Sequence, residues 1–287
     1  MSHVVTPPEP PVEPPAAALA VPVDPSLSWE PIALPEGGES NRWVNGVRAV
    51  LAWLAIIAFI APSMLLVALG VDPDWVVTGP IRWWARVELW LLGLRLEVEG
   101  VENLPTGPFI LMSNHQSVLD VFTYASYFDR PIFYVLKKEF GRIPLLGWFL
   151  RQTDQIFLDR KDREKAILSL RRGVEKLHDG KMTVIFPEGT RTAPGTLGAF
   201  KKGPFHLALQ ARVPVVPVTT LNSGLLLPTR SLKFRRGTIR LVVSPPIDTT
   251  AWAEETLDEH VEAVRQAIAG PLGAYRASLG YRGNSRS

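Results

Sequence analysis

Residues 109–128 read FILMSNHQSVLDVFTYASYF, and this stretch decides the fold class. Its apolar start predicts a short strand over 109–112, and the apolar period over 118–128 predicts a helix. The same succession of a short β-rich run, a polar loop and an amphipathic helix recurs along the chain from Arg95 onward. Such alternation is typical of an α/β sheet with flanking helices, in which reactive side chains tend to lie in loops at strand ends.

Further runs extend this pattern over most of the chain. Strands are expected at residues 95–99, 132–136, 155–158, 182–186, 213–219 and 238–243, and helices at 162–178, 202–211 and 256–269. We therefore predict a mixed sheet with flanking helices over residues 95–287, preceded by an N-terminal, membrane-associated helical pair over 41–94.

The composition excludes several classes of site. The 287 residues contain no cysteine, so disulfides, thiolate zinc sites, iron–sulfur clusters and a cysteine nucleophile are ruled out. The formal net charge is +3, but residues 1–40 hold six acidic side chains, ten of the 26 prolines and no Lys or Arg. We interpret residues 1–40 as a disordered, proline-rich acidic tail, and not as a signal peptide. The remaining body is basic, which suits an anionic partner such as phosphate, a membrane surface or nucleic acid.

Residues 49–71 form an apolar run without a charged side chain. At about 1.5 Å per residue, such a helix is long enough for a bilayer core of roughly 30 Å. Pro62 in mid-run removes a helical donor and permits a kink. The run is therefore expected to cross the membrane or to stay in one leaflet; a buried core helix is the alternative.

Residues 81–94 predict a second helix that is too short and too charged to span. Tryptophans and the arginines Arg82 and Arg86 are typical of a helix in the membrane interface, with guanidinium groups near lipid phosphates. The alternative is an amphipathic helix packed on the domain.

A histidine follows the strand at 109–112. His115 and Asp120 are five residues apart, so they do not share one helical face. With His115 in the loop and Asp120 in the first helical turn, the carboxylate can orient the imidazole, whose other nitrogen then takes a proton from an alcohol. The alternative is structural, because Ser117 and Asp120 also match a helix capping box.

A second polar segment, TVIFPEGTR, runs from an apolar strand into Glu188, Gly189 and Arg191. A guanidinium and backbone donors at a turn suit a phosphate group. Lys201 and Lys202 open the next helix, where the helix dipole disfavours cations, so an anion is expected nearby. No nucleotide-binding or zinc-hydrolase motif is present.

The segments NHQSVLD, KKEFGRIPLLG with IFLDR after it, FPEGTR and VPVVPV follow the order and spacing of four sequence blocks of the glycerolipid acyltransferases. Over residues 80–250 the chain resembles this family, and within it the bacterial lysophosphatidic acid acyltransferases. The resemblance implies a catalytic acyltransferase domain over 95–287. It also implies transfer of an acyl group from acyl-CoA or acyl-carrier protein to the hydroxyl of lysophosphatidic acid, without a covalent intermediate.

The resemblance also assigns residues. His115 would be the general base and Asp120 its orienting carboxylate. The remaining candidates would bind the acceptor phosphate or shape its pocket: Lys137, Arg160, Glu188, Gly189 and Arg191. The block containing Pro214 and Pro217 would help to form the acyl-donor side. Where family members carry glycine shortly before IF-x-DR, this chain has Asp154 and Gln155.

This chemistry needs no cofactor and no metal, since an acyl thioester supplies its own driving force. The expected partners are a lysophospholipid, the acyl donor and the membrane, with the catalytic domain on the cytoplasmic face; nucleic acid is not expected. The alternatives are an acyltransferase for another lysolipid, such as lyso-ornithine lipid, and a non-catalytic membrane lipid-binding protein.

Overall fold

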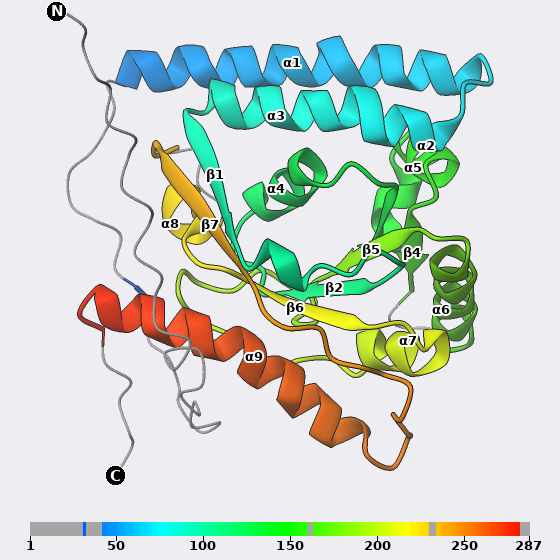
Figure 1. The fold of residues 1–287 in the computed structure, drawn as a ribbon. Helices are drawn as coiled ribbons and strands as arrows, with labels where there is room; N and C mark the ends of the chain where they lie inside the picture. The colour runs from blue at the N-terminus through cyan, green and yellow to red at the C-terminus, as the bar shows by residue number, and fades with distance from the viewer. Residues whose placement is uncertain (1–30, 33–41, 160–162, 230–233, 282–287) are drawn as a thin grey trace, which may run out of the picture.

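A seven-stranded mixed sheet forms the centre of the protein in a computed structural model, which describes residues 31–32, 42–159, 163–229 and 234–281 (Figure 1). The strand order is β1-β7-β6-β2-β5-β3-β4. The strands are β1 (Leu94–Glu99), β2 (Ile110–Ser113), β3 (Ile132–Lys137), β4 (Ile156–Leu158), β5 (Met182–Ile185), β6 (Val215–Thr220) and β7 (Gly237–Val243). All seven predicted strands are present, within two residues at each end.

Strand direction brings functional loops together at one edge of the sheet. The five strands from β6 to β4 run parallel to one another, whereas β7 is antiparallel to β6, and β1 is parallel to β7. The carboxyl ends of the five parallel strands therefore share an edge with the amino ends of β1 and β7.

Helices cover both faces of this sheet. In chain order, the helices before the sheet are α1 (Arg42–Ala68), α2 (Pro73–Val76), the π-helix η2 (Val77–Ile81) and α3 (Arg82–Leu91). They are followed by α4 (Leu119–Tyr127), α5 (Leu146–Gln152), α6 (Arg163–His178), α7 (Gly203–Ala211), α8 (Ser223–Leu226) and α9 (Leu257–Ser278). Short 3₁₀ turns lie at η3 (Val101–Asn103) and η4 (Lys138–Arg142).

Each sheet face has its own hydrophobic core. One core joins strand residues such as Leu111 and Val218 to α4 and α3 through Tyr124 and Leu89. The other joins alternate strand residues to α6, α7 and α9. All four residues of β2 are buried, as expected for a parallel strand covered on both faces.

The first helix, α1, starts earlier than the predicted 49–71 and lies beside α3 at one end of the molecule (Figure 1). Its segment Gly46–Ala68 is long and apolar enough to cross a membrane, and 24% of the most apolar window is buried. Pro62 stays within the helix. Most of the apolar surface of α1 is therefore exposed, so the alternative of a buried core helix is wrong.

The interfacial prediction for α3 needs a correction. The guanidinium groups of Arg82 and Arg86 donate to the carbonyl oxygens of Ser126 and Tyr127, where α4 ends. These carbonyls lack helical partners, and cations are favourable at a helix C-terminus. The two arginines thus hold α3 on α4, while the tryptophans Trp83 and Trp90 are exposed on the outer side. The helix packs on the domain by one side and presents aromatic rings on the other.

The predicted end of the last helix at residue 269 is wrong, because α9 continues through Pro271 to Ser278. Proline cannot donate to the carbonyl of Ala267 four residues earlier, and the hydroxyl of Ser244 donates to that oxygen instead, at 3.2 Å. Leu272 is fully buried, so packing outweighs the loss of one helical hydrogen bond.

The turn before β4 explains the departure from the family pattern. Asp154 has a positive φ of 63°, a conformation that glycine adopts freely and that Asp tolerates better than most residues. Its carboxylate pairs with Lys176 and, at 2.7 Å, with Lys181. Burial opposes the charge, but these hydrogen bonds lower the pKa of Asp154. The turn is therefore kept with Asp in place of Gly.

Candidate active site

The candidate residues converge on the edge where the parallel strands end. His115 follows β2, Glu188 and Arg191 follow β5, and Lys137 ends β3. Since β2, β5 and β3 are neighbours in the sheet, sequence segments up to 76 residues apart (115 to 191) meet there. Arg160, two residues beyond β4, lies outside the described residues.

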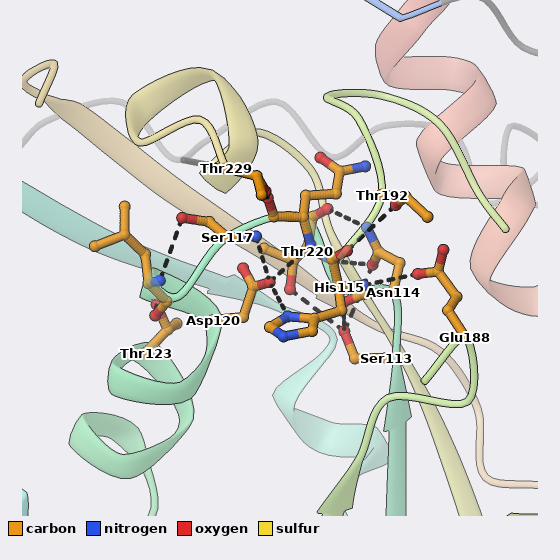
Figure 2. Close-up of polar contacts among 12 residues, drawn as sticks. Ser113, Asn114, His115, Ser117, Asp120, Thr123, Glu188, Thr192, Thr220 and Thr229 are labelled. Atoms are coloured by element: carbon orange, nitrogen blue, oxygen red, sulfur yellow. Dashed lines mark hydrogen bonds and ion pairs between the residues drawn. The ribbon is translucent and has the colours of Figure 1, made fainter. Parts of the chain in front are cut away.

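His115 and Asp120 form a direct contact (Figure 2). The distance from Nδ1 of His115 to Oδ2 of Asp120 is 2.7 Å. The carboxylate of Asp120 is fully buried, whereas 16% of the histidine side chain is exposed. The Phe186 ring stacks on the imidazole, with centroids 4.0 Å apart and planes 16° apart. Within the described part of the chain nothing hydrogen-bonds to Nε2, so this nitrogen is left to meet a substrate.

Asp120 performs a structural task at the same time. Its Oδ2 also accepts the backbone N–H groups of Gln116, at 2.9 Å, and Ser117, at 3.0 Å. The Ser117 hydroxyl donates to the carbonyl oxygen of Leu227 at 2.8 Å and accepts the backbone N–H of Leu119 at 3.3 Å, so only the Asp120 half of the predicted capping box forms. The two interpretations of Asp120 are thus compatible, because one oxygen fixes both the start of α4 and the imidazole.

The loop before the histidine is held by contacts that the sequence pattern did not predict. Asn114 and Thr220 exchange two hydrogen bonds of 2.8 Å, through the amide of Asn114 and the backbone of Thr220. The Tyr124 hydroxyl donates to Ser113 at 2.7 Å. All four residues are fully buried. The end of β2 is therefore locked to β6 and α4, which leaves the histidine loop little freedom.

Glu188 joins this loop to the loop after β5 (Figure 2). One carboxylate oxygen accepts the backbone N–H of His115 at 2.8 Å, and the other accepts that of Gly198 at 2.7 Å. Burial raises the pKa of Glu188 to about 7, although these hydrogen bonds oppose the rise. Gly189 has a φ of 70°, so the turn in FPEGTR needs glycine or a residue that tolerates this strain.

The candidate cations remain available for an anion. Lys137 and Arg191 are exposed and, among the described residues, form no ion pair. The adjacent Lys138 differs, because it binds Asp159 at 2.6 Å. The sequence also predicted an anion near Lys201 and Lys202, at the start of α7. The structure places a carboxylate of the protein there, because Lys202 pairs with Asp258 of α9 at 2.6 Å.

The fourth sequence block lies beside the histidine strand. Pro214 precedes β6, and Pro217 lies within it opposite Met112 of β2. This block therefore forms the strand next to β2 on the side away from Lys137 and Arg191.

Comparisons with known proteins agree with this geometry. A family model described as "Acyltransferase" matches residues 95–221. A 1-acyl-sn-glycerol-3-phosphate acyltransferase of Saccharomyces cerevisiae is 34% identical over 241 residues, covering 81% of this chain and 78% of the relative. The chain belongs to this acyltransferase family.

Two further members extend the comparison. A Pseudomonas aeruginosa protein of the same name is 33% identical over 208 residues, which cover 66% of this chain and 80% of the Pseudomonas protein. The crystal structure of the 1-acyl-sn-glycerophosphate (LPA) acyltransferase PlsC from Thermotoga maritima has a TM-score of 0.66 and 26% identity, covering 84% of this chain and 100% of that one. The predicted acyltransferase family and mixed α/β fold are confirmed, and the alternative of a non-catalytic protein is not supported.

Proposed function

We propose that the protein moves a fatty acyl group from acyl-CoA or acyl-carrier protein to the free hydroxyl of a 1-acylglycerol 3-phosphate, giving phosphatidic acid. The observation that carries this proposal is the 2.7 Å contact from His115 Nδ1 to Asp120, with Nε2 free of any described partner. A carboxylate on Nδ1 selects the tautomer whose Nε2 can accept a proton. The names of the relatives supply the acceptor class.

In the proposed reaction, Nε2 takes the proton of the acceptor hydroxyl while its oxygen attacks the thioester carbonyl. The tetrahedral intermediate collapses, the carbon–sulfur bond breaks, and the thiolate takes the proton from the imidazolium. The products are the ester and the free thiol, so no acyl-enzyme forms and no cofactor or metal is consumed. General base catalysis contributes about 10²- to 10⁴-fold, and positioning of the two substrates supplies much of the rest.

Lys137 and Arg191 are the proposed ligands of the acceptor phosphate. Both are exposed; Lys137 ends β3 and Arg191 follows β5, and these neighbouring strands lie on one side of β2, the strand that His115 follows. A planar guanidinium can bind two phosphate oxygens at once. This feature favours a phosphate-bearing acceptor over a lyso-ornithine lipid. Arg160 is a further proposed ligand from the sequence alone.

We also propose that α1 and the outer side of α3 lie in a membrane, within an anchoring segment over 41–94 that precedes the catalytic domain. Their exposed apolar side chains include Trp43, Leu54, Ile57, Leu65, Trp83 and Trp90. Because acyl-CoA and acyl-carrier protein are cytoplasmic, the catalytic domain would lie on that face. Salt screens exposed charges but does not release buried hydrocarbon. Membrane fractions should therefore keep the protein in high salt and release it in detergent; release by salt alone would contradict this location.

The function is tested with purified full-length protein in detergent. The protein is incubated with acyl-CoA or acyl-carrier protein and, separately, with lysophosphatidic acid, other lysophospholipids and lyso-ornithine lipid, and acylated product is measured. We expect turnover with lysophosphatidic acid. Turnover only with lyso-ornithine lipid would contradict the proposed acceptor, and no turnover with any acceptor would contradict the proposed reaction.

A further inference from the structure

Three arginines line a cavity of about 630 Å³ on the flank of the sheet that β1 and β7 occupy. Arg48 comes from α1, Arg95 from β1, and Arg236 from the residue before β7. The remaining walls are largely apolar and include Leu51, Trp90 and Leu91. The cavity thus combines positive charge with an apolar surface.

These guanidinium groups have no counter-charge in the protein as described. In residues 31–32, 42–159, 163–229 and 234–281, none of the three forms an ion pair, and Nη1 of Arg48 is buried without a hydrogen-bond partner. The charge of Arg236 acts unfavourably on Arg48. Nearby Arg240 differs, since it pairs with Glu99 at 2.5 Å. Arg95 and Arg236 are exposed, so the cost falls on Arg48, whose buried donor lacks a partner beside a like charge. An anion in the cavity would satisfy that donor and reduce the repulsion.

The cavity is separate from the proposed acceptor site. It lies at the amino ends of β1 and β7, which occupy one flank of the sheet. Three strand spacings separate β1 from β2, which is about 14 Å. Lys137 ends β3 and Arg191 follows β5, on the opposite side of β2. One phosphate therefore cannot bind both groups of cations at once.

The position along α1 identifies the kind of anion. Arg48 is the last charged residue before the apolar run at 49–71, so it marks the depth at which hydrocarbon gives way to headgroups. Trp90, 75% exposed, suits the same depth. In Figure 1 the amino ends of β1 and β7 lie under the first half of α1.

We propose that Arg48, Arg95 and Arg236 bind the phosphate of an anionic membrane phospholipid, whose acyl chains lie against Leu51 and Trp90. This lipid is a bound neighbour of the enzyme rather than its acceptor. The inference rests on the proposed membrane location of α1 and α3. It does not depend on the reaction at His115.

Native mass spectrometry of the full-length protein in neutral detergent tests the inference, with phosphatidylglycerol or phosphatidylcholine added. We expect retention of phosphatidylglycerol in preference to phosphatidylcholine. The variant Arg95→Gln/Arg236→Gln should bind phosphatidylglycerol at least about tenfold more weakly, which corresponds to about 1.4 kcal/mol, because it loses two of the three guanidinium groups that face the phosphate. The control Arg171→Gln/Arg172→Gln removes the same charge from an exposed part of α6 and should bind as the parent does.

Several results would overturn the proposal. An equal loss in both double variants would mean that binding follows net charge alone. Displacement of the lipid by inorganic phosphate at equal concentration would indicate a site for the free anion. The acidic N-terminal segment is a competing occupant: if lipid binds only after Glu30→Gln/Glu36→Gln/Glu39→Gln, the cavity belongs to that segment.

Turnover separates this inference from the proposed function. The variant Arg95→Gln/Arg236→Gln should keep its turnover of lysophosphatidic acid in detergent and melt at the parent temperature. Selective lipid binding without turnover in the parent protein would contradict only the reaction. Turnover in the parent without selective lipid binding would contradict only the lipid site.

Discussion

Glu188 accepts the backbone N–H of His115 at 2.8 Å, so the loop after β5 holds the loop after β2 directly at its histidine. The second carboxylate oxygen holds Gly198 in the same way. Because both contacts are to the backbone, Glu188 acts as a positioning residue for the imidazole. Both of its carboxylate oxygens accept hydrogen bonds from the protein.

The first prediction concerns the pH dependence that Glu188 confers. Burial raises its pKa to about 7, from 4.5, so between these pH values the folded protein holds a proton that the unfolded chain releases. The free energy of unfolding should therefore fall as the pH rises through this window, by roughly 3 kcal/mol at most. The measurement is urea unfolding of the parent and of Glu188→Gln, whose difference should follow this slope.

Glu175→Gln is the matched control, since Glu175 is exposed on α6. It should leave both the slope and the turnover unchanged. Glu188→Gln should also lower turnover, because an amide cannot accept both backbone N–H groups with its single oxygen. A pH profile of stability that is identical in the parent and in Glu188→Gln would refute the buried titration.

The sequence predicts those structural elements that depend on residues close to one another in the chain. The strands and the position of His115 follow from apolar periodicity and loop chemistry. The continuation of α9 past Pro271 does not, because a hydroxyl from Ser244, 23 residues earlier in the chain, satisfies the freed carbonyl. Nor do the contacts of Arg82 to the end of α4. Such partners are set by tertiary packing, and a local window contains no signal for them.

The site shows the same division. The pairing of His115 with Asp120 could be predicted, since the two residues are only five apart. That Glu188 holds the backbone of His115 could not, because the two are 73 residues apart in sequence. The arginine cavity also depends on three distant segments.

The second prediction separates the two tasks of Asp120. Asp120→Asn keeps an oxygen for the backbone N–H groups of Gln116 and Ser117 but loses the charge beside the imidazole. Turnover should fall by up to about 10⁴-fold with little change in melting temperature. Asp120→Ala should lose activity and also about 0.5–2 kcal/mol of stability, as for a lost helix cap. An Asp120→Asn protein that keeps its activity but is less stable would show that Asp120 caps the helix and does not orient the imidazole for catalysis.

The third prediction concerns the acceptor phosphate. Arg191→Ala should raise KM for lysophosphatidic acid far more than KM for the acyl donor, and Arg191→Lys should also be impaired because a point charge cannot bind two oxygens side by side. Steady-state kinetics with each substrate varied in turn measure both effects. Lys202→Ala is the control, since Lys202 is paired with Asp258. An equal rise for donor and acceptor would argue against phosphate binding by Arg191.

The fourth prediction concerns the turn at Asp154. Its positive φ suits glycine, so Asp154→Gly should lose only the partly exposed ion pairs to Lys176 and Lys181, which is typically 0–1 kcal/mol. Asp154→Ala loses the same pairs and adds backbone strain, so it should be less stable than Asp154→Gly by about 1 kcal/mol. Denaturant unfolding of the two variants tests this order; equal stability would contradict the strain argument.

The most direct test of the central claim is the turnover and binding of His115→Ala. We expect that acylation of lysophosphatidic acid is lost almost completely, since no other group near the acceptor hydroxyl is assigned to take its proton. Lysophosphatidic acid should still bind with an affinity close to that of the parent, because Lys137 and Arg191 remain in place. A His115→Ala protein that still acylates lysophosphatidic acid at the parental rate would contradict the assignment of His115 as the general base.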